Sequence, residues 1–150
     1  MYMNNLNLFA VGSFEINSVT TGPITFNHGD KLQFTTTTLV SPTPSGLLEL
    51  AKSDLEDKNN IHLMSRLIYE SEYGMQKTLQ LFITPINALG KSAAGDLYKV
   101  VTPFEIKTSE LPSRKADGKN GFLRLKITWQ VDQASGEVLN TVLPIYEKVR

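Results

Sequence analysis

The sequence contains no cysteine among its 150 residues. This absence excludes disulfide bonds, thiolate nucleophiles, and zinc or iron–sulfur sites built on cysteine ligands. Neither sign of charge is in excess, because 15 basic residues balance 15 acidic residues. A net charge of zero provides no overall field that would attract nucleic acid or a membrane surface. Any electrostatic function must therefore come from local clusters of charge.

Long apolar segments are also missing. The longest, near Leu79–Ile86 and Leu8–Val11, are far shorter than the ~20 residues that a membrane-spanning helix needs. The N-terminal residues Met1–Asn5 have no basic side chain and no apolar core, so they do not resemble a secretory signal. We therefore expect a cytoplasmic protein without a membrane partner. The length is typical of one domain, and we expect residues 1–150 to form a single domain.

Alternation of apolar and polar residues predicts strands along most of the chain. We expect a first strand over Leu6–Ile16, with a bulge at Gly12. A hairpin with a short turn is expected to join Ile24–Phe26 to Leu32–Val40. The later strands are expected over Thr78–Ile86, Leu97–Ile106, Gly121–Val131 and Val138–Val149.

Two of these later strands have faces that can be assigned by alternation. In 121–131 we expect one set of side chains to face the core, namely Leu123, Leu125, Ile127, Trp129 and Val131. The other set is expected to face outward, and it comprises Phe122, Arg124, Lys126, Thr128 and Gln130. In 78–86 we expect Leu79, Leu81 and Ile83 on one face and Gln80, Phe82 and Thr84 on the other, with the leucines inside.

The middle of the chain has the spacing of helices. Thr43 followed by Pro44 predicts the capped start of a first helix. A second helix is expected between Asn60 and Gly74. Apolar residues recur at helical spacing in both segments: Leu47, Leu48, Ala51 and Leu55 in the first, and Ile61, Met64, Leu67 and Ile68 in the second.

The expected order is three strands, two helices and four strands. This order predicts a mainly β protein with a helical insert, an α+β fold. A curved antiparallel sheet that closes into a barrel, with the helices at one end, fits the order best, and its first part has the element order of an OB-like barrel. An α+β sandwich with the helices packed on one face is the alternative.

No catalytic or metal-binding pattern is present in the sequence. His28 and His62 lie in a predicted turn and a predicted helix, without a carboxylate pattern typical of a metal site. Gly90–Ser92 resembles part of a phosphate-binding loop, but Pro85 stands where that motif needs glycine. We therefore predict a protein that is not an enzyme and has no cofactor and no metal.

Charge is distributed unevenly along the chain. Residues 45–75 contain six acids against three bases, and residues 107–126 contain six bases against two acids. Phe82 and Phe122 are expected on outward faces near the basic segment. Cationic side chains neutralise phosphates while aromatic rings stack on bases, so this combination is typical of proteins that bind single strands.

We therefore predict binding of single-stranded nucleic acid across an outer sheet face and the loops at 87–96 and 107–120. The predicted contact residues are Lys91, Lys99, Arg114, Lys115, Lys119, Arg124, Lys126, Phe82 and Phe122.

The alternative is a protein–protein interaction module, either a homo-oligomeric scaffold or an inhibitor of a partner factor. Phe9, Val11, Phe82 and Phe122 on outer faces would form an apolar patch larger than a monomer usually exposes. Such a chain would suit an accessory protein encoded by a phage or plasmid. A third hypothesis is a barrel that holds a small apolar ligand.

Overall fold

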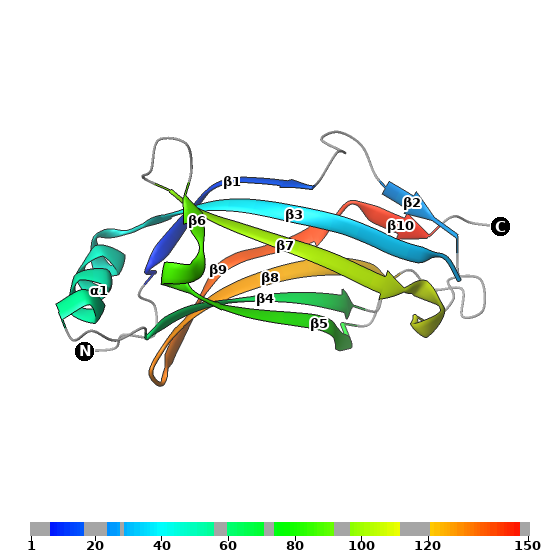
Figure 1. Ribbon diagram of the computed structural model, residues 1–150. Helices are drawn as coiled ribbons and strands as arrows, with labels where there is room; N and C mark the ends of the chain where they lie inside the picture. The colour runs from blue at the N-terminus through cyan, green and yellow to red at the C-terminus, as the bar shows by residue number, and fades with distance from the viewer. Residues whose placement is uncertain are drawn as a thin grey trace.

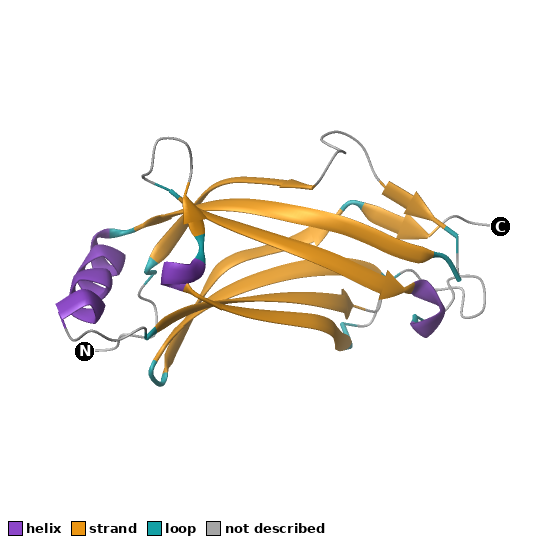
Figure 2. Cartoon of the chain, in the orientation of Figure 1, coloured by secondary structure: helices purple, strands orange, loops and turns teal. Residues whose placement is uncertain are grey.

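Two antiparallel sheets pack face to face and enclose one apolar core (Figure 1). The computed structural model describes residues 7–16, 24–27, 29–55, 60–70, 74–91, 97–111 and 121–147. In these residues the sheets do not close on each other, so the structure is a β-sandwich rather than the predicted OB-like barrel. The expectation of a mainly β chain with a helical insert is confirmed (Figure 2).

We name the two sheets A and B. Sheet A contains, in spatial order, β1 (Phe9–Ile16), β3 (Lys31–Pro42), β7 (Tyr98–Lys107) and β6 (Gly90–Lys91). Sheet B contains, in spatial order, β5 (Gln76–Pro85), β4 (Ile61–Glu70), β8 (Phe122–Val131) and β9 (Ala134–Leu143). The remaining elements are β2 (Ile24–Phe26), β10 (Ile145–Glu147), the helix α1 (Pro44–Leu55) and the 3-10 turns η1 (Ile86–Ala88) and η2 (Thr108–Glu110).

Strict alternation on the long central strands builds the core. On β8 the buried side chains are Leu123, Leu125, Ile127 and Trp129, as predicted. On sheet A, Phe34 of β3 and Phe104 of β7 lie opposite each other with their ring centroids 5.3 Å apart. Phe82 of β5 meets Phe104 edge to face at 5.6 Å, so aromatic contacts join the two sheets.

The second predicted helix is wrong, because Ile61–Glu70 is the central strand β4. Its apolar residues also fit a period of two, and Ile61, Leu63 and Leu67 are buried on the inner face. The segment is paired on both sides, to β5 and to β8, and this pairing overrides the weaker helical spacing.

The predicted hairpin between Ile24–Phe26 and Leu32–Val40 is also wrong. β2 pairs in parallel with β10, near the C-terminal end of the described chain. β7 pairs with one edge of β3 along Lys31–Val40, and β1 pairs with the other edge along Thr36–Pro42, so neither edge of β3 pairs with β2. The predicted bulge at Gly12 is confirmed by a shift in register between Val11 and Ser13.

The assignment of the two faces of β5 is reversed from Gln80 onward, whereas Leu79, at the bulge, packs against the core as predicted. Phe82 lies opposite the buried Ser65 and points into the core, whereas Leu81 lies opposite Arg66 and points outward. Both faces of this strand carry large apolar side chains, so alternation alone does not decide between them. The Phe82–Phe104 contact decides it, because the larger ring fills the space between the sheets.

The start of α1 is anchored to the beginning of β1. The Gly46 amide donates to Thr43 Oγ1 at 3.1 Å, which confirms Thr43 as the cap. The Thr43 hydroxyl donates in turn to the Asn7 carbonyl, and the Thr43 amide donates to the Leu8 carbonyl at 2.9 Å. Among the described helices, none has the length and apolar content that a membrane span requires.

We predict that Gly46→Ala destabilises the protein. A Cβ at this position would lie 2.0 Å from the Leu8 carbonyl oxygen, which is backbone and cannot move cheaply. The free energy of unfolding should fall by about 1–3 kcal/mol in urea denaturation, despite the better helix propensity of alanine. Gly90→Ala is the matched control, because its Cβ would meet nothing within 4 Å. Equal stability of the two variants would contradict this prediction.

Candidate interaction surface

The helix α1 exposes most of its leucines. Leu47, Leu48 and Leu55, which we call the α1 leucines, are 57%, 74% and 88% exposed. The helix contacts β3 and β4 on its other side, where Leu50 packs against the core and Ser53 is buried. The predicted apolar spacing of this helix therefore lies largely on the face that points to solvent.

A second exposed apolar pair lies on the outer face of β5. Leu81 is 45% exposed and Ile83 is 56% exposed, and we call these residues the β5 pair. Met64 of β4 lies opposite Ile83 and is half-buried. Because Phe82 between them points inward, the pair faces outward as a consequence of the core packing.

Two adjoining polar hollows lie between α1 and the outer face of sheet B. One, of about 120 Å³, is lined by residues of α1 together with Asn60 and Asp132. The other, of about 320 Å³, is lined by His62 and Ile83 and shares Asn60 and Asp132 with the first. The shared residues place Ile83 near the polar side of α1, whereas the α1 leucines line neither hollow.

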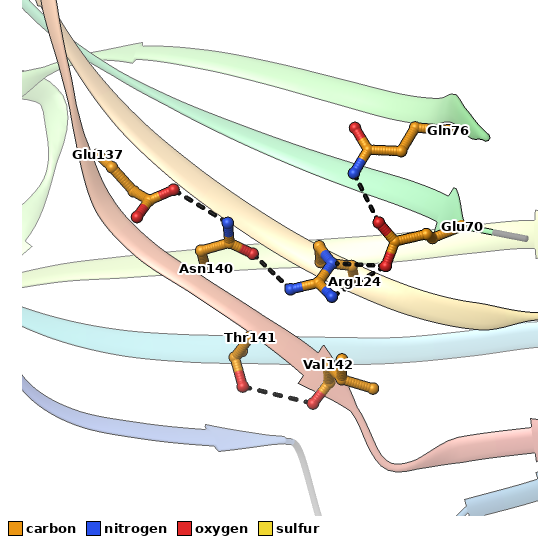
Figure 3. Close-up of polar contacts among 7 residues, drawn as sticks. All are labelled: Glu70, Gln76, Arg124, Glu137, Asn140, Thr141 and Val142. Atoms are coloured by element: carbon orange, nitrogen blue, oxygen red, sulfur yellow. Dashed lines mark hydrogen bonds and ion pairs between the residues drawn. The ribbon is translucent and has the colours of Figure 1, made fainter. Parts of the chain in front are cut away.

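The outer face of sheet B also carries a chain of polar contacts that runs across all four strands (Figure 3). Gln76 of β5 donates to Glu70 Oε2 at 2.8 Å, and Arg124 Nη2 of β8 donates to Glu70 Oε1 at 2.9 Å. Arg124 Nη1 donates to Asn140 Oδ1 of β9 at 2.7 Å, and Asn140 donates to Glu137 at 2.9 Å. These bonds tie the strands together on the solvent side.

Two carboxyl groups are tuned by their neighbours. Hydrogen bonds from Gln76 and from Arg124 hold the pKa of Glu70 below its usual value. On the outer face of sheet A, a hydrogen bond from Lys31 lowers the pKa of Glu105. Both carboxylates belong to ion pairs on sheet surfaces, which assigns them a structural role.

The structure separates the residues predicted to bind nucleic acid. Arg124, Lys126 and Phe122 share the outer face of sheet B, as predicted. Arg124, however, is engaged by Glu70 and Asn140. Lys99 is exposed on β7, in the other sheet. Arg114, Lys115, Lys119 and the side chain of Lys91 lie outside the described residues.

Phe82 and Lys99 line the same groove of about 260 Å³ beside β7, together with Leu89 and Val101. Phe82 contacts Phe104 within the sandwich, so its ring is not free to stack on a base on the outer face. Phe9 is buried as well, which removes a second member of the apolar patch expected from the sequence.

Comparisons with known proteins give structural likenesses but no match in sequence. No protein-family model and no curated protein matches the sequence. Among solved structures, the chain is similar to AggA, the major subunit of aggregative adherence fimbriae type I from Escherichia coli. The sequence identity is 9%, the TM-score is 0.42, and the alignment covers 98% of this chain and 100% of that chain.

The prediction of single-stranded nucleic-acid binding is wrong. Among the described residues, the cations that were expected to share one surface lie on two different sheets, and Phe82 points into the core. The described exposed surface favours the alternative, an interaction with protein.

Sequence reasoning missed the β5 pair as an exposed feature. Leu81 and Ile83 were placed inside because leucine and isoleucine are usually buried. One signal in the sequence could have found them. Phe82 is the largest apolar side chain of 78–86, so the face that carries Phe82 is the one expected to be buried in the core.

The contacts of Glu70 generate a prediction about pH. A carboxyl whose folded-state pKa lies below its unfolded value of about 4.5 stabilises the fold at neutral pH, and this contribution is lost as the pH falls through the folded pKa. In urea denaturation, wild type should therefore exceed Glu70→Gln in stability at pH 7, and this difference should shrink below pH 4.5.

The control is a double-mutant cycle with Arg124→Gln. When Arg124 is absent, Glu70→Gln should have a smaller effect, and less of that effect should depend on pH. A stability difference between wild type and Glu70→Gln that stays constant from pH 7 to pH 3 would contradict the role of the Glu70 charge.

Proposed function

We propose that this chain is a non-enzymatic protein–protein interaction module that associates with itself or docks on a partner protein. The observation that carries the proposal is the exposure of the α1 leucines, Leu47, Leu48 and Leu55. An exposed leucine in isolation is ordinary, but clustered exposed leucines on one short helix are typical of interaction sites. Ile83 lines a polar hollow that adjoins the one beside α1, so a further exposed apolar side chain lies near the helix.

The position of α1 supports the same proposal. The helix is fixed at its start by Thr43 and Gly46, so its exposed leucines are held in place before any partner binds. A preorganised apolar surface loses less conformational freedom on binding than a mobile one. An amphipathic helix that lies in a partner's groove, or against a second copy, would bury these side chains.

The polar hollows beside the helix would supply specificity. Asn60 and Asp132 line both hollows, and Glu49 and Lys52 of α1 line one of them. A polar rim around an apolar centre is the usual composition of a specific protein interface. The cytoplasmic location expected from the N-terminal sequence stays a prediction.

We expect the double variant Leu48→Glu with Leu55→Glu to weaken association by roughly tenfold or more, because each substitution would bury an unpaired charge in the interface. Sedimentation velocity measures self-association, and capture on immobilised protein measures partner binding. Circular dichroism should show an unchanged fold, since both side chains are exposed.

Val142→Glu is the matched control, because it makes the same type of change at an exposed position on β9, the edge of sheet B opposite β5. It should leave association as in wild type. If wild type and the double α1 variant have the same solution mass and retain the same proteins, α1 is not an interaction surface and the proposal fails.

A further inference from the structure

We propose that β5 pairs edge to edge and antiparallel with β5 of a second copy of this chain. The inference rests on the self-association in the proposed function, and it assigns to it one partner, a second copy, and one further surface, the edge of β5 rather than the α1 leucines. Two four-stranded sheets would then join into one continuous sheet across a two-fold axis. The case depends on three observations. The other sheet edges are protected, part of β5 pairs regularly with β4, and this regular stretch is self-complementary.

The other long edge on the same side of the sandwich, β7, is protected. The Glu105 amide donates to Gln80 Oε1 at 3.1 Å, so this N–H already has a partner from sheet B. Pro103, two residues earlier, lies on the same edge because backbone N–H groups alternate along a strand, and proline has none to offer. Gly90 of β6 covers Lys99 further along. A second chain would find few donors here.

The edges on the opposite side of the sandwich are also protected. β1 and β9 contact each other there. β1 is interrupted by a bulge between Val11 and Ser13, and β9 has a bulge where it pairs with Ile127 and Thr128. Bulges and contacts of this kind are how proteins prevent strands from pairing with other molecules.

β5 is bulged only near its start, and the rest of its edge is regular and uncharged. Among the described residues, β5 pairs only with β4. The register shifts once, at Leu79, and from Gln80 the pairing is regular until Pro85 ends the strand. The single charge of the strand, Lys77, lies before the bulge. The regular stretch is therefore Gln80–Thr84, and its midpoint is Phe82.

A two-fold axis at Phe82 makes this stretch self-complementary. Leu81 of one copy would lie opposite Ile83 of the other, and the reverse contact would form at the same time. Leu81 of each copy is thus covered by Ile83 of the other copy, and Ile83 by Leu81. Antiparallel pairing also keeps the two Lys77 side chains at opposite ends, so like charges do not meet.

Cysteine cross-linking tests this register, and the cysteine-free sequence provides no background. An equimolar mixture of Leu81→Cys and Ile83→Cys proteins, with oxidised glutathione as the oxidant, should form a disulfide-linked dimer. It should form roughly tenfold faster or more than in a control mixture, because pairing raises the effective concentration of the two thiols. Both positions are exposed, so neither substitution should prevent folding.

Two controls make the test specific to the register. Either variant alone should cross-link slowly, because two copies of the same residue would be diagonal neighbours about 7–8 Å apart, beyond the Cβ separation of about 3.5–4.5 Å in a disulfide. A mixture of Leu81→Cys with Thr128→Cys, on β8 of the same outer face, should also react slowly.

The outcomes separate this inference from the proposed function. Fast and selective cross-linking of the Leu81→Cys and Ile83→Cys mixture supports it. If wild type self-associates in sedimentation velocity but this mixture reacts no faster than the Thr128 control, another surface is used, and only the inference is overturned. If wild type remains a monomer and the mixture reacts slowly, the inference also fails, and the α1 variants then decide the proposed function by partner capture.

Discussion

Burial of two facing apolar sheet surfaces is the interaction on which the whole structure depends. β4 and β8 supply one surface, and β3 and β7 supply the other, with the Phe34, Phe82 and Phe104 rings between them. Each fully buried side chain of this type contributes about 1.5–3 kcal/mol relative to an exposed one. Because the strands are held by this contact, every side chain of the alternate set must point outward.

The core contains polar side chains, and two of their atoms, Thr38 Oγ1 and Trp129 Nε1, have no hydrogen-bond partner among the described residues. Thr36, Thr38 and Thr102 face inward on sheet A and are buried. The Thr102 hydroxyl donates to Ser65 Oγ at 3.4 Å, which forms a hydrogen bond between the two sheets. The bond requires each strand to keep the register within its own sheet, because a one-residue shift of β7 would turn Thr102 outward and a one-residue shift of β4 would turn Ser65 outward. Polar contacts thus add specificity to a packing that apolar burial makes stable.

Surface chemistry follows from the same constraint. On sheet B the outward set includes the Glu70–Arg124–Asn140 contacts, which need no partner, and the β5 pair, which remains exposed. The buried side of α1 is short and consists of Gly46, Leu50 and Ser53, so the α1 leucines lie outside the core. The apolar surface available to a partner is therefore what remains after the sandwich has been packed.

The sequence by itself determined the elements whose pattern had one physical solution. Thr43–Pro44 could only start a helix, Gly12 marked a bulge, and the alternation of 121–131 assigned both faces of β8 correctly. Tertiary structure alone decided the segments with two solutions. Ile61–Glu70 fitted a helix or a strand until pairing on both sides selected the strand. The alternation of 78–86 allowed Phe82 to face either way, and its contact with Phe104 of the other sheet selected the inward direction. Whether cations far apart in the chain share a surface depends on the order of the strands in the sheets, which the local sequence pattern does not encode.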